Sequence, residues 1–392
     1  MTNKRSPHLS RNTVVKSFRG RLGGDEHYIT LTADGEGDLA SQLSEIEHRY
    51  SATLRALNLE PESAIFRRLF VSDAMNQASL IASSELAKSA ADNPVAISII
   101  QQPPLPGAKL ALLAYHIDGD PSVHKQKISV HNTLIEKKGR RHLWTTGLCS
   151  GQGFPDPSSA VQTRRILTNL VDTLEAQHGS LFEHCIRTWF YLKDVDVFYQ
   201  GMVDARGQFF TEQGLTSETH YIASTGIEGG CSHRYDVVVL DAYSNLDLNP
   251  KQVSFLNDFS RLCATKDYNV HFERGTRIAY ADRTHHFISG TASIDTSGNV
   301  VHIGDVTRQA EYALGHVEAL LQFGGASLDD LGHIIVYLRD PTDYPRVSDV
   351  LGHALPNIPT VFVQGAVCRP QWLVELEGIA VASHEDPSLP SF

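Results

Sequence analysis

Apolar and polar positions along the chain follow one plan that occurs three times. In each copy, a stretch with apolar residues at helical spacing precedes a short apolar strand, and a second helical stretch follows that strand. The three short strands are predicted at 65–71, 186–192 and 334–338. Each copy closes with two apolar runs that we expect to pair as a hairpin: 95–100 with 110–117, 221–227 with 235–243, and 361–367 with 372–380.

This plan predicts an α+β fold in which each copy places its helices on one face of a sheet. Three copies that each expose one sheet face can bury those faces together, which gives a pseudo-trimer within one chain. Turn-forming segments near 118–120 and 246–250 predict domains at 27–119, 120–246 and 247–385. The first domain has only a short leading strand near 27–31. The basic segment 1–26 is expected to be disordered, and it is no secretory signal because no apolar core follows its cationic residues.

The last apolar run contains a carboxylate, Glu375, and burial of a carboxylate is costly unless it is paired or protonated. Cys368 and Arg369 lie at the tip of the connection before this run. Strand alternation is expected to place Glu375 and Glu377 on one face and Trp372 on the other. Arg369 could pair with Glu375 structurally or hold an anionic substrate beside it, and the residue types alone leave both interpretations open.

Composition restricts the kinds of molecule that we expect the protein to bind. The net charge of −11 opposes nucleic-acid binding, which depends on neutralising phosphates, and no apolar run is long enough to span a membrane. Five scattered cysteines without a CxxC motif predict free thiols in a reducing compartment, so we expect a cytoplasmic protein. The nineteen histidines show no metal-ligand spacing and no Gly-rich phosphate loop occurs, so neither a metal nor an organic cofactor is expected.

The third copy carries a series of short motifs that runs through its whole length. They are Phe287-Ile288-Ser289-Gly290, Gly298, Gly325-Ala326-Ser327, Tyr337-Leu338-Arg339-Asp340 and Val374-Glu375-Leu376-Glu377. The series resembles the Rid (YjgF, endoribonuclease L-PSP) superfamily. That resemblance implies a chorismate-mutase-like fold, trimeric assembly and small-molecule sites between protomers. It also implies an arginine that holds a substrate carboxylate, as in the imine and enamine deaminases of the family.

Other stretches resemble the chorismatases, which are Rid-like enzymes that cleave the enolpyruvyl ether of chorismate and release pyruvate. These stretches are SGTASI at 289–294 and NPKQVS at 249–254. In addition, Arg369 stands only six residues before Glu375, whereas the deaminase branch has a longer spacing.

The chorismatase resemblance implies a hydrolase or lyase with a site between the second and third copies. Glu375 would be the general acid, because a glutamic acid on an apolar strand can deliver a proton near neutral pH. Arg369 would anchor a substrate carboxylate, since a guanidinium donates two parallel hydrogen bonds. The other candidates for substrate binding are Arg274, Arg187, Arg206, Cys368, Ser289, Gly290, Thr291 and Tyr191.

Two other functions stay open at this stage. One is an imine or enamine deaminase that uses Arg369 and an activated water. The other is a non-catalytic protein that binds a small ligand, because the second copy has Val239 where the third has Glu375. The candidates also have structural interpretations: Arg187 and Arg206 as an internal network, and Cys368 as a packing thiol. We expect a small carboxylate as ligand, and a monomeric pseudo-trimer or a small homo-oligomer.

Overall fold

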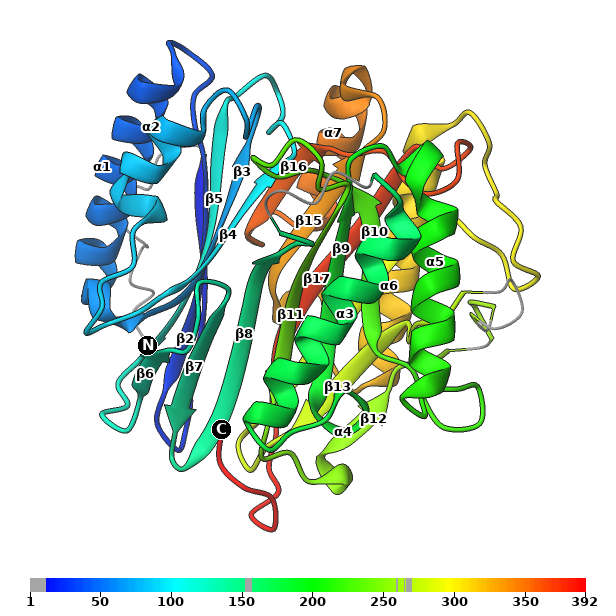
Figure 1. Cartoon of the computed structure of the whole chain (residues 1–392). Helices are drawn as coiled ribbons and strands as arrows, with labels where there is room; N and C mark the ends of the chain where they lie inside the picture. Colours follow the sequence, from blue (N-terminus) through cyan, green and yellow to red (C-terminus); the bar gives the residue numbers. More distant parts are fainter. Residues whose placement is uncertain (1–11, 152–156, 259, 264, 266–269) are drawn as a thin grey trace.

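Three mixed β-sheets, each with helices on one side, make up the protein (Figure 1). The structure is a computed structural model that describes residues 12–151, 157–258, 260–263, 265 and 270–392. The prediction of three α+β units in a pseudo-trimer is confirmed, with the sheets facing inward and the helices outward. Among the described residues, no helix combines the length and the apolar character that crossing a membrane requires.

The first unit has a five-stranded sheet in the order β1-β2-β5-β3-β4. Its elements are β1 (Thr13–Phe18), β2 (Asp25–Thr32), α1 (Leu39–Leu57), β3 (Ala64–Val71), α2 (Ala78–Ser83), β4 (Ala96–Gln101) and β5 (Leu110–Asp118). The expectation that the segment up to residue 26 is disordered is wrong for β1, which pairs antiparallel with β2; residues 1–11 lie outside the described part. The unit departs from the shared plan instead at α2, which is much shorter than its counterparts α5 and α7.

The second and third units each have six strands. The second contains β6 (His124–Lys127), β7 (Asn132–Lys137), β8 (Arg140–Leu148), α3 (Ser159–Ala176), α4 (Leu181–His184), β9 (Cys185–Leu192), α5 (Val195–Glu212), β10 (Ala223–Glu228) and β11 (Val238–Asn245). The third contains β12 (Val253–Phe255), β13 (Gly275–Ala279), β14 (Arg283–Ala292), α6 (Val306–Phe323), β15 (Leu331–Leu338), α7 (Tyr344–Ala354), β16 (Thr360–Gln364) and β17 (Val374–Ser383). The strand orders are β10-β9-β11-β8-β7-β6 and β12-β13-β14-β17-β15-β16.

The closing strands of each unit do not form the hairpin that their closeness in sequence predicts. In the third unit, β15 pairs parallel with β16 on one side and antiparallel with β17 on the other, so β15 separates the two closing strands. β17 also pairs with β14, which makes it a central strand. A central strand is covered on both faces, and this explains why its sequence is an almost unbroken apolar run.

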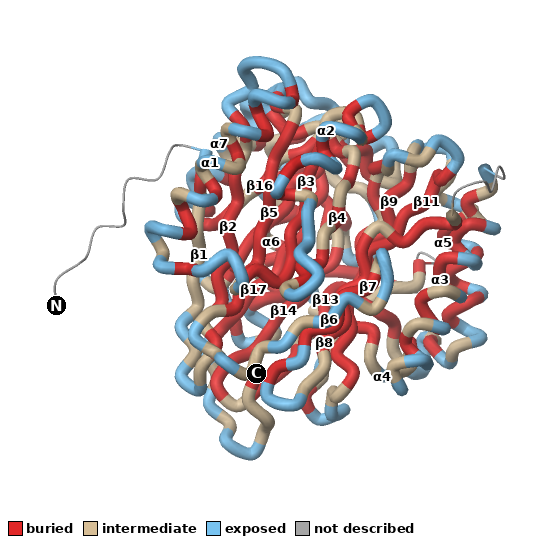
Figure 2. The backbone as a smooth tube through the Cα atoms, turned by 60° about the vertical axis from the view of Figure 1, so that its left-hand side comes forward, coloured by how far each residue is buried: buried red, intermediate tan, exposed pale blue. Residues whose placement is uncertain are grey.

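Buried apolar side chains form one central core and three peripheral ones. The central core gathers rings from all three units, and the stacked pair Phe66 and Trp144 joins the first unit to the second at a centroid distance of 4.7 Å. Tyr243 stacks on Phe287 between the second and third units at 5.3 Å. Each peripheral core fills the space between one sheet and its own helices. Figure 2 shows the result, with buried strands inside and exposed positions on the outer helices and loops.

Each interface between units also contains a buried ion pair. Arg68 donates to Asp241 at 3.0 Å, Arg187 to Glu377 at 2.6 Å, and Arg283 to Glu26 at 2.7 Å. All six side chains are almost fully buried. Removing one partner from such a pair leaves an uncompensated buried charge, so the pairs favour this one arrangement of the units.

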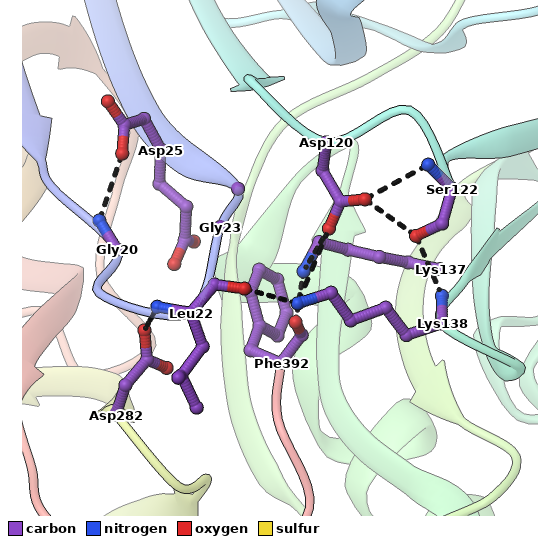
Figure 3. Close-up of polar contacts among 12 residues, drawn as sticks. Gly20, Leu22, Gly23, Asp25, Asp120, Ser122, Lys137, Lys138, Asp282 and Phe392 are labelled. Atoms are coloured by element: carbon purple, nitrogen blue, oxygen red, sulfur yellow. Dashed lines mark hydrogen bonds and ion pairs between the residues drawn. The ribbon is translucent and has the colours of Figure 1, made fainter.

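The loop between β1 and β2 fastens the first unit to the other two (Figure 3). The backbone N–H of Leu22 donates to Asp282 of the third unit at 3.1 Å, and the Leu22 carbonyl accepts from Lys138 of the second. Lys137 pairs with Asp120 at 3.2 Å beside the same loop. Leu22 belongs to the segment 1–26 that was expected to be disordered, so that expectation is wrong for this loop as well.

Candidate active site

A cavity of about 350 Å³ lies between the second and third units. The second unit contributes α5 and β10, and the third contributes the segment 270–274, the end of β14, the connection 365–373 and the start of β17. The lining residues are Tyr199, Gln200, Val203, Arg206, Ser224, Thr225, Gly226, Val270, Phe272, Arg274, Gly290, Ala292, Ile294, Cys368, Arg369, Trp372 and Glu375. The wall therefore combines apolar side chains with three arginines and one carboxyl group, which is typical of a small-ligand site.

Glu375 is the acidic group of the cavity. It is the second residue of β17, where it lies opposite Ala292 of β14 and Tyr337 of β15, and it is only 6% exposed. Burial raises the pKa of Glu375 to about 8, and the negative charge of Glu377 adds to the rise, while Arg187 and Arg274 oppose it. With this pKa, Glu375 is mostly protonated at neutral pH and can donate a proton to a bound molecule.

Glu377 lies two residues further along β17, and both of its carboxylate oxygens accept hydrogen bonds. Its Oε2 accepts from Arg187 at 2.6 Å and from the Thr225 hydroxyl, and its Oε1 accepts from Trp189 and Tyr337 at 2.9 Å each. These donors come from both units. The network holds a negative charge close to Glu375, and that charge is one physical cause of the raised pKa of Glu375.

Gly290 lies at an irregularity of β14, where the pairing with β17 shifts between Ile288 and Thr291. Its backbone N–H donates to Thr225 at 2.9 Å. A Cβ atom at this position would lie 2.2 Å from Oε1 of Glu375, so the carboxyl group rests directly against the glycine backbone. Any side chain at position 290 would push Glu375 away from its present place.

Three guanidinium groups line the cavity, and aromatic rings support each of them. Arg206 of α5 lies over Phe190 and Phe210 and donates to Ser224 at 3.3 Å. The other two are Arg274, which lies over Phe272, and Arg369, which lies over Trp372 and donates to the Gly298 carbonyl at 2.9 Å. Arg274 also donates to the Cys263 carbonyl at 3.3 Å. Packing on rings restricts each side chain, and planar guanidinium groups are suited to binding carboxylates.

Cys368 lines the cavity beside Tyr199, and their side chains interact. Burial raises the pKa of Cys368 to about 12, and the nearby Glu375 adds to the rise. A thiol with such a pKa is protonated at neutral pH and is a poor nucleophile.

The structure brings six of the ten predicted site residues to the cavity wall: Glu375, Arg369, Arg274, Arg206, Cys368 and Gly290. The other four do not line it. Arg187 pairs with Glu377, which matches its structural interpretation, and Tyr191 is buried in the central core over Arg68. The Ser289 hydroxyl donates to the Glu273 carbonyl, and Thr291 donates to the Ser289 carbonyl, so both stabilise the irregular part of β14.

Among the residues that sequence reasoning did not assign to the site are Thr225 and Tyr199, and it misplaced Trp372. Thr225, in β10, links Gly290 to Glu377, and Tyr199, on α5, lies beside Cys368. Trp372 lines the same cavity as Glu375, although alternation was expected to place it on the opposite face. The reason is that β17 begins only at Val374, so strand alternation does not extend back to Trp372.

The corresponding place in the second unit has no acid. Val239 lies opposite Tyr191 in the pairing of β11 with β9, as Glu375 lies opposite Tyr337 in the pairing of β17 with β15. In the first unit, β5 begins with the apolar residues Leu110 and Ala111. Within the described part of the chain, the acidic site is therefore complete in the third unit alone.

The three-unit fold and a small-molecule cavity between two units define a Rid-type protein. The family model described as Endoribonuclease L-PSP matches residues 276–382. The 3-aminoacrylate deaminase RutC of Acinetobacter baylyi is 31% identical over 96 residues, which are 24% of this chain and 76% of RutC. The chain belongs to the endoribonuclease L-PSP (Rid) family.

Two further proteins resemble most of the chain rather than one unit. The 3-hydroxybenzoate synthase of Streptomyces hygroscopicus is 26% identical over 261 residues, which are 59% of this chain and 73% of the synthase. The crystal structure of a chorismatase superposes with a TM-score of 0.61 at 17% identity and covers 91% of this chain and 98% of the chorismatase. At that identity the likeness shows the fold alone, and its extent includes the first unit.

Proposed function

We propose that the protein is a chorismatase-type enzyme that cleaves the enolpyruvyl ether of chorismate and releases pyruvate. The observation that carries this proposal is Glu375, a buried carboxyl group with a pKa of about 8 in a cavity that three arginines line. Chorismate is a dianion with an acid-labile enol ether, so it needs two cationic anchors and one proton donor. The cavity contains both kinds of group.

The chemistry assigned to Glu375 is protonation of the enol ether. Its proton adds to the side-chain methylene carbon and makes a methyl group, and the ether oxygen shares the positive charge as an oxocarbenium ion. A water molecule adds to this cation and loses a proton, and the hemiketal collapses as the ether C–O bond breaks, which releases pyruvate and leaves a hydroxyl group on the ring. A well-placed general acid of matched pKa contributes about 10²–10⁴-fold to the rate.

A hydroxybenzoate is our proposal for the second product, because the relative from Streptomyces hygroscopicus is a 3-hydroxybenzoate synthase. For this product the ring must also lose one hydroxyl group and one ring hydrogen as water, which makes it aromatic and returns the water that released pyruvate, so the reaction consumes no net water. Hydrolysis without loss of water from the ring would instead give pyruvate and a cyclohexadiene carboxylate with two ring hydroxyl groups. Chromatography against standards of the two ring products separates the two outcomes.

We assign Arg206, Arg274 and Arg369 to the two carboxylates of the substrate. Arg206 approaches from the second unit and the other two approach from the third, so the substrate would lie across the interface. Charge-assisted hydrogen bonds from such groups are about twice as strong as neutral ones. Both units are then required for binding, although only the third supplies the acid.

Deamination of an imine or enamine is the second candidate, and the 31% identity with RutC favours it. In that reaction an arginine holds the substrate carboxylate and Glu375 protonates the leaving nitrogen. The spacing of six residues between Arg369 and Glu375 is shorter than the deaminase branch has, which favours the first proposal.

The test is to incubate the purified protein with chorismate and to follow pyruvate with coupled lactate dehydrogenase. Chromatography identifies the ring product, and ammonia release from an amino-acid-derived imine is measured in parallel. Glu375→Gln keeps the shape but removes the titratable proton, so it should abolish turnover and preserve chorismate binding. Chorismate turnover by Glu375→Gln at the wild-type rate would refute the assignment of the acid. Tight chorismate binding by the wild type without any pyruvate would instead favour a non-catalytic ligand-binding protein.

A further inference from the structure

We propose that the second unit contains a zinc site with the ligands Cys149, His233 and Asp236. Cys149 directly follows β8, and the other two residues lie on the connection 229–237 that leads into β11. One potential ligand atom from each residue lies within 4.8 Å of the other two. This inference is independent of the chemistry proposed for Glu375.

The distances within the cluster match a tetrahedral zinc centre. Nδ1 of His233 lies 3.5 Å from the sulfur of Cys149 and 3.0 Å from Oδ2 of Asp236. Zinc bonds of about 2.3 Å to sulfur and about 2.0–2.1 Å to nitrogen and oxygen, at the tetrahedral angle, place sulfur and nitrogen about 3.5 Å apart and nitrogen and oxygen about 3.3 Å apart. Small adjustments of side chains would therefore admit the ion.

Hydrogen bonds also link the three side chains. Nδ1 of His233 lies within reach of both the thiol and the carboxylate, and the Cys149 side chain hydrogen-bonds to Asp236. A metal ion between the three atoms would replace these hydrogen bonds with three coordinate bonds. Binding would displace the thiol proton of Cys149 into solvent, because the thiolate is the form that ligates.

The surroundings support the carboxylate as a ligand. Asp236 is only 2% exposed, and its Oδ2 lies 3.0 Å from Nδ1 of His233. Its other oxygen, Oδ1, accepts from the Ser150 hydroxyl, which orients the group as second-shell hydrogen bonds do at metal centres. A zinc ion would add a positive charge directly beside this buried carboxylate.

The donor set favours zinc over other divalent ions. One thiolate, one imidazole and one carboxylate combine soft and borderline ligands, whereas calcium and magnesium prefer oxygen alone. His233 is 34% exposed, which gives the ion a path from solvent, and we assign the fourth position to water. Cys231 lies on the same turn but is not within the cluster of ligand atoms.

The position of the cluster in the second sheet indicates what role the zinc ion would have. β8 pairs with β11 as β14 pairs with β17, so the cluster lies at the end of the second sheet that corresponds to the Glu375 end of the third. There it would join the end of β8 to the turn before β11. The second unit would thus hold a structural ion where the third unit holds its acid.

The experiment measures the metal directly. The full chain is purified without chelator and its zinc content is determined by plasma mass spectrometry. Chelated protein is then titrated with zinc by calorimetry and with cobalt by absorption, since a cobalt–thiolate bond gives a charge-transfer band. We expect about one zinc per chain and a cobalt–thiolate band.

Variants make the test specific to these residues. Cys149→Ser and His233→Ala should each lower zinc affinity by more than about 100-fold, and Ser150→Ala by about 10–100-fold. Cys231→Ser is the matched control, with a thiol on the same turn, and should bind zinc like the wild type. Because His233 is partly exposed, its variant tests the site even if Cys149→Ser fails to fold. Unaltered zinc affinity in His233→Ala, a wild type that binds no zinc, or a disulfide between Cys149 and Cys231 would each overturn the proposal.

Discussion

Replacing Glu375 by Gln should make the protein more stable, and the gain should increase with pH. In the folded protein, burial and the charge of Glu377 raise the pKa of Glu375 from an ordinary value of 4.5 to about 8. The folded state therefore holds a proton that the unfolded state releases between pH 4.5 and about 8. In that window the wild type loses stability as the pH rises, whereas a glutamine does not titrate.

The size of the effect follows from the two pKa values. Each pH unit between them contributes about 1.4 kcal/mol, so the full interval amounts to about 5 kcal/mol of unfolding free energy. About 3 kcal/mol of this is already lost at pH 7, and below pH 4.5 the contribution is constant. Because Glu375 is only 6% exposed, screening by solvent does not remove the effect.

The assay is urea unfolding of both proteins at pH 5, 7 and 9. The stability difference between Glu375→Gln and wild type should grow by several kcal/mol from the lowest to the highest pH. Glu311→Gln, on the exposed face of α6, is the matched control for replacing a carboxyl group by an amide.

A difference that does not change with pH would refute this reasoning. It would mean that Glu375 ionises as an ordinary carboxyl group and cannot be the proton donor near neutral pH. The same pKa predicts that turnover of chorismate by the wild type declines above pH about 8, as the acid loses its proton.

Three further substitutions test other parts of the site. Arg369→Ala should raise the KM for chorismate about 10–100-fold with little change in kcat, because a charge-assisted hydrogen bond contributes about 1.5–3 kcal/mol; an unchanged KM would contradict its role as an anchor. Gly290→Ala should lower kcat at least about tenfold, since its Cβ would lie 2.2 Å from Oε1 of Glu375. The control Gly352→Ala, at a position with open space around it, should leave kcat unchanged. Glu377→Gln should lower the unfolding free energy by about 3–5 kcal/mol, because it removes the charge that pairs with buried Arg187. A loss below about 1 kcal/mol in urea unfolding would contradict a stabilising role for the hydrogen-bond network around Glu377.

Local patterns in the sequence were enough to predict the three units, their main helices and the resemblance to the family. Apolar periodicity and short motifs depend on neighbouring residues, so they survive without knowledge of the tertiary fold. Glu375 could be identified in the same way, because a carboxylate within an apolar run is visible in the sequence alone. The assignment of Glu375, Arg369, Arg274 and Arg206 to substrate remains a prediction, although the structure brings these residues to one cavity.

Only the tertiary structure decided which distant groups meet. In the sheet, β17 lies between β14 and β15. The sequence alone predicts instead that β17 pairs with β16 as a hairpin, because the two runs are close together in the chain. Packing of the second unit against the third turned Arg187 toward Glu377 and brought Thr225 to Gly290. Cys149 and His233 are 84 residues apart, so their contact leaves no spacing motif to find. Contacts of this kind depend on how whole sheets pack, and sequence periodicity reports only which face of each element is buried.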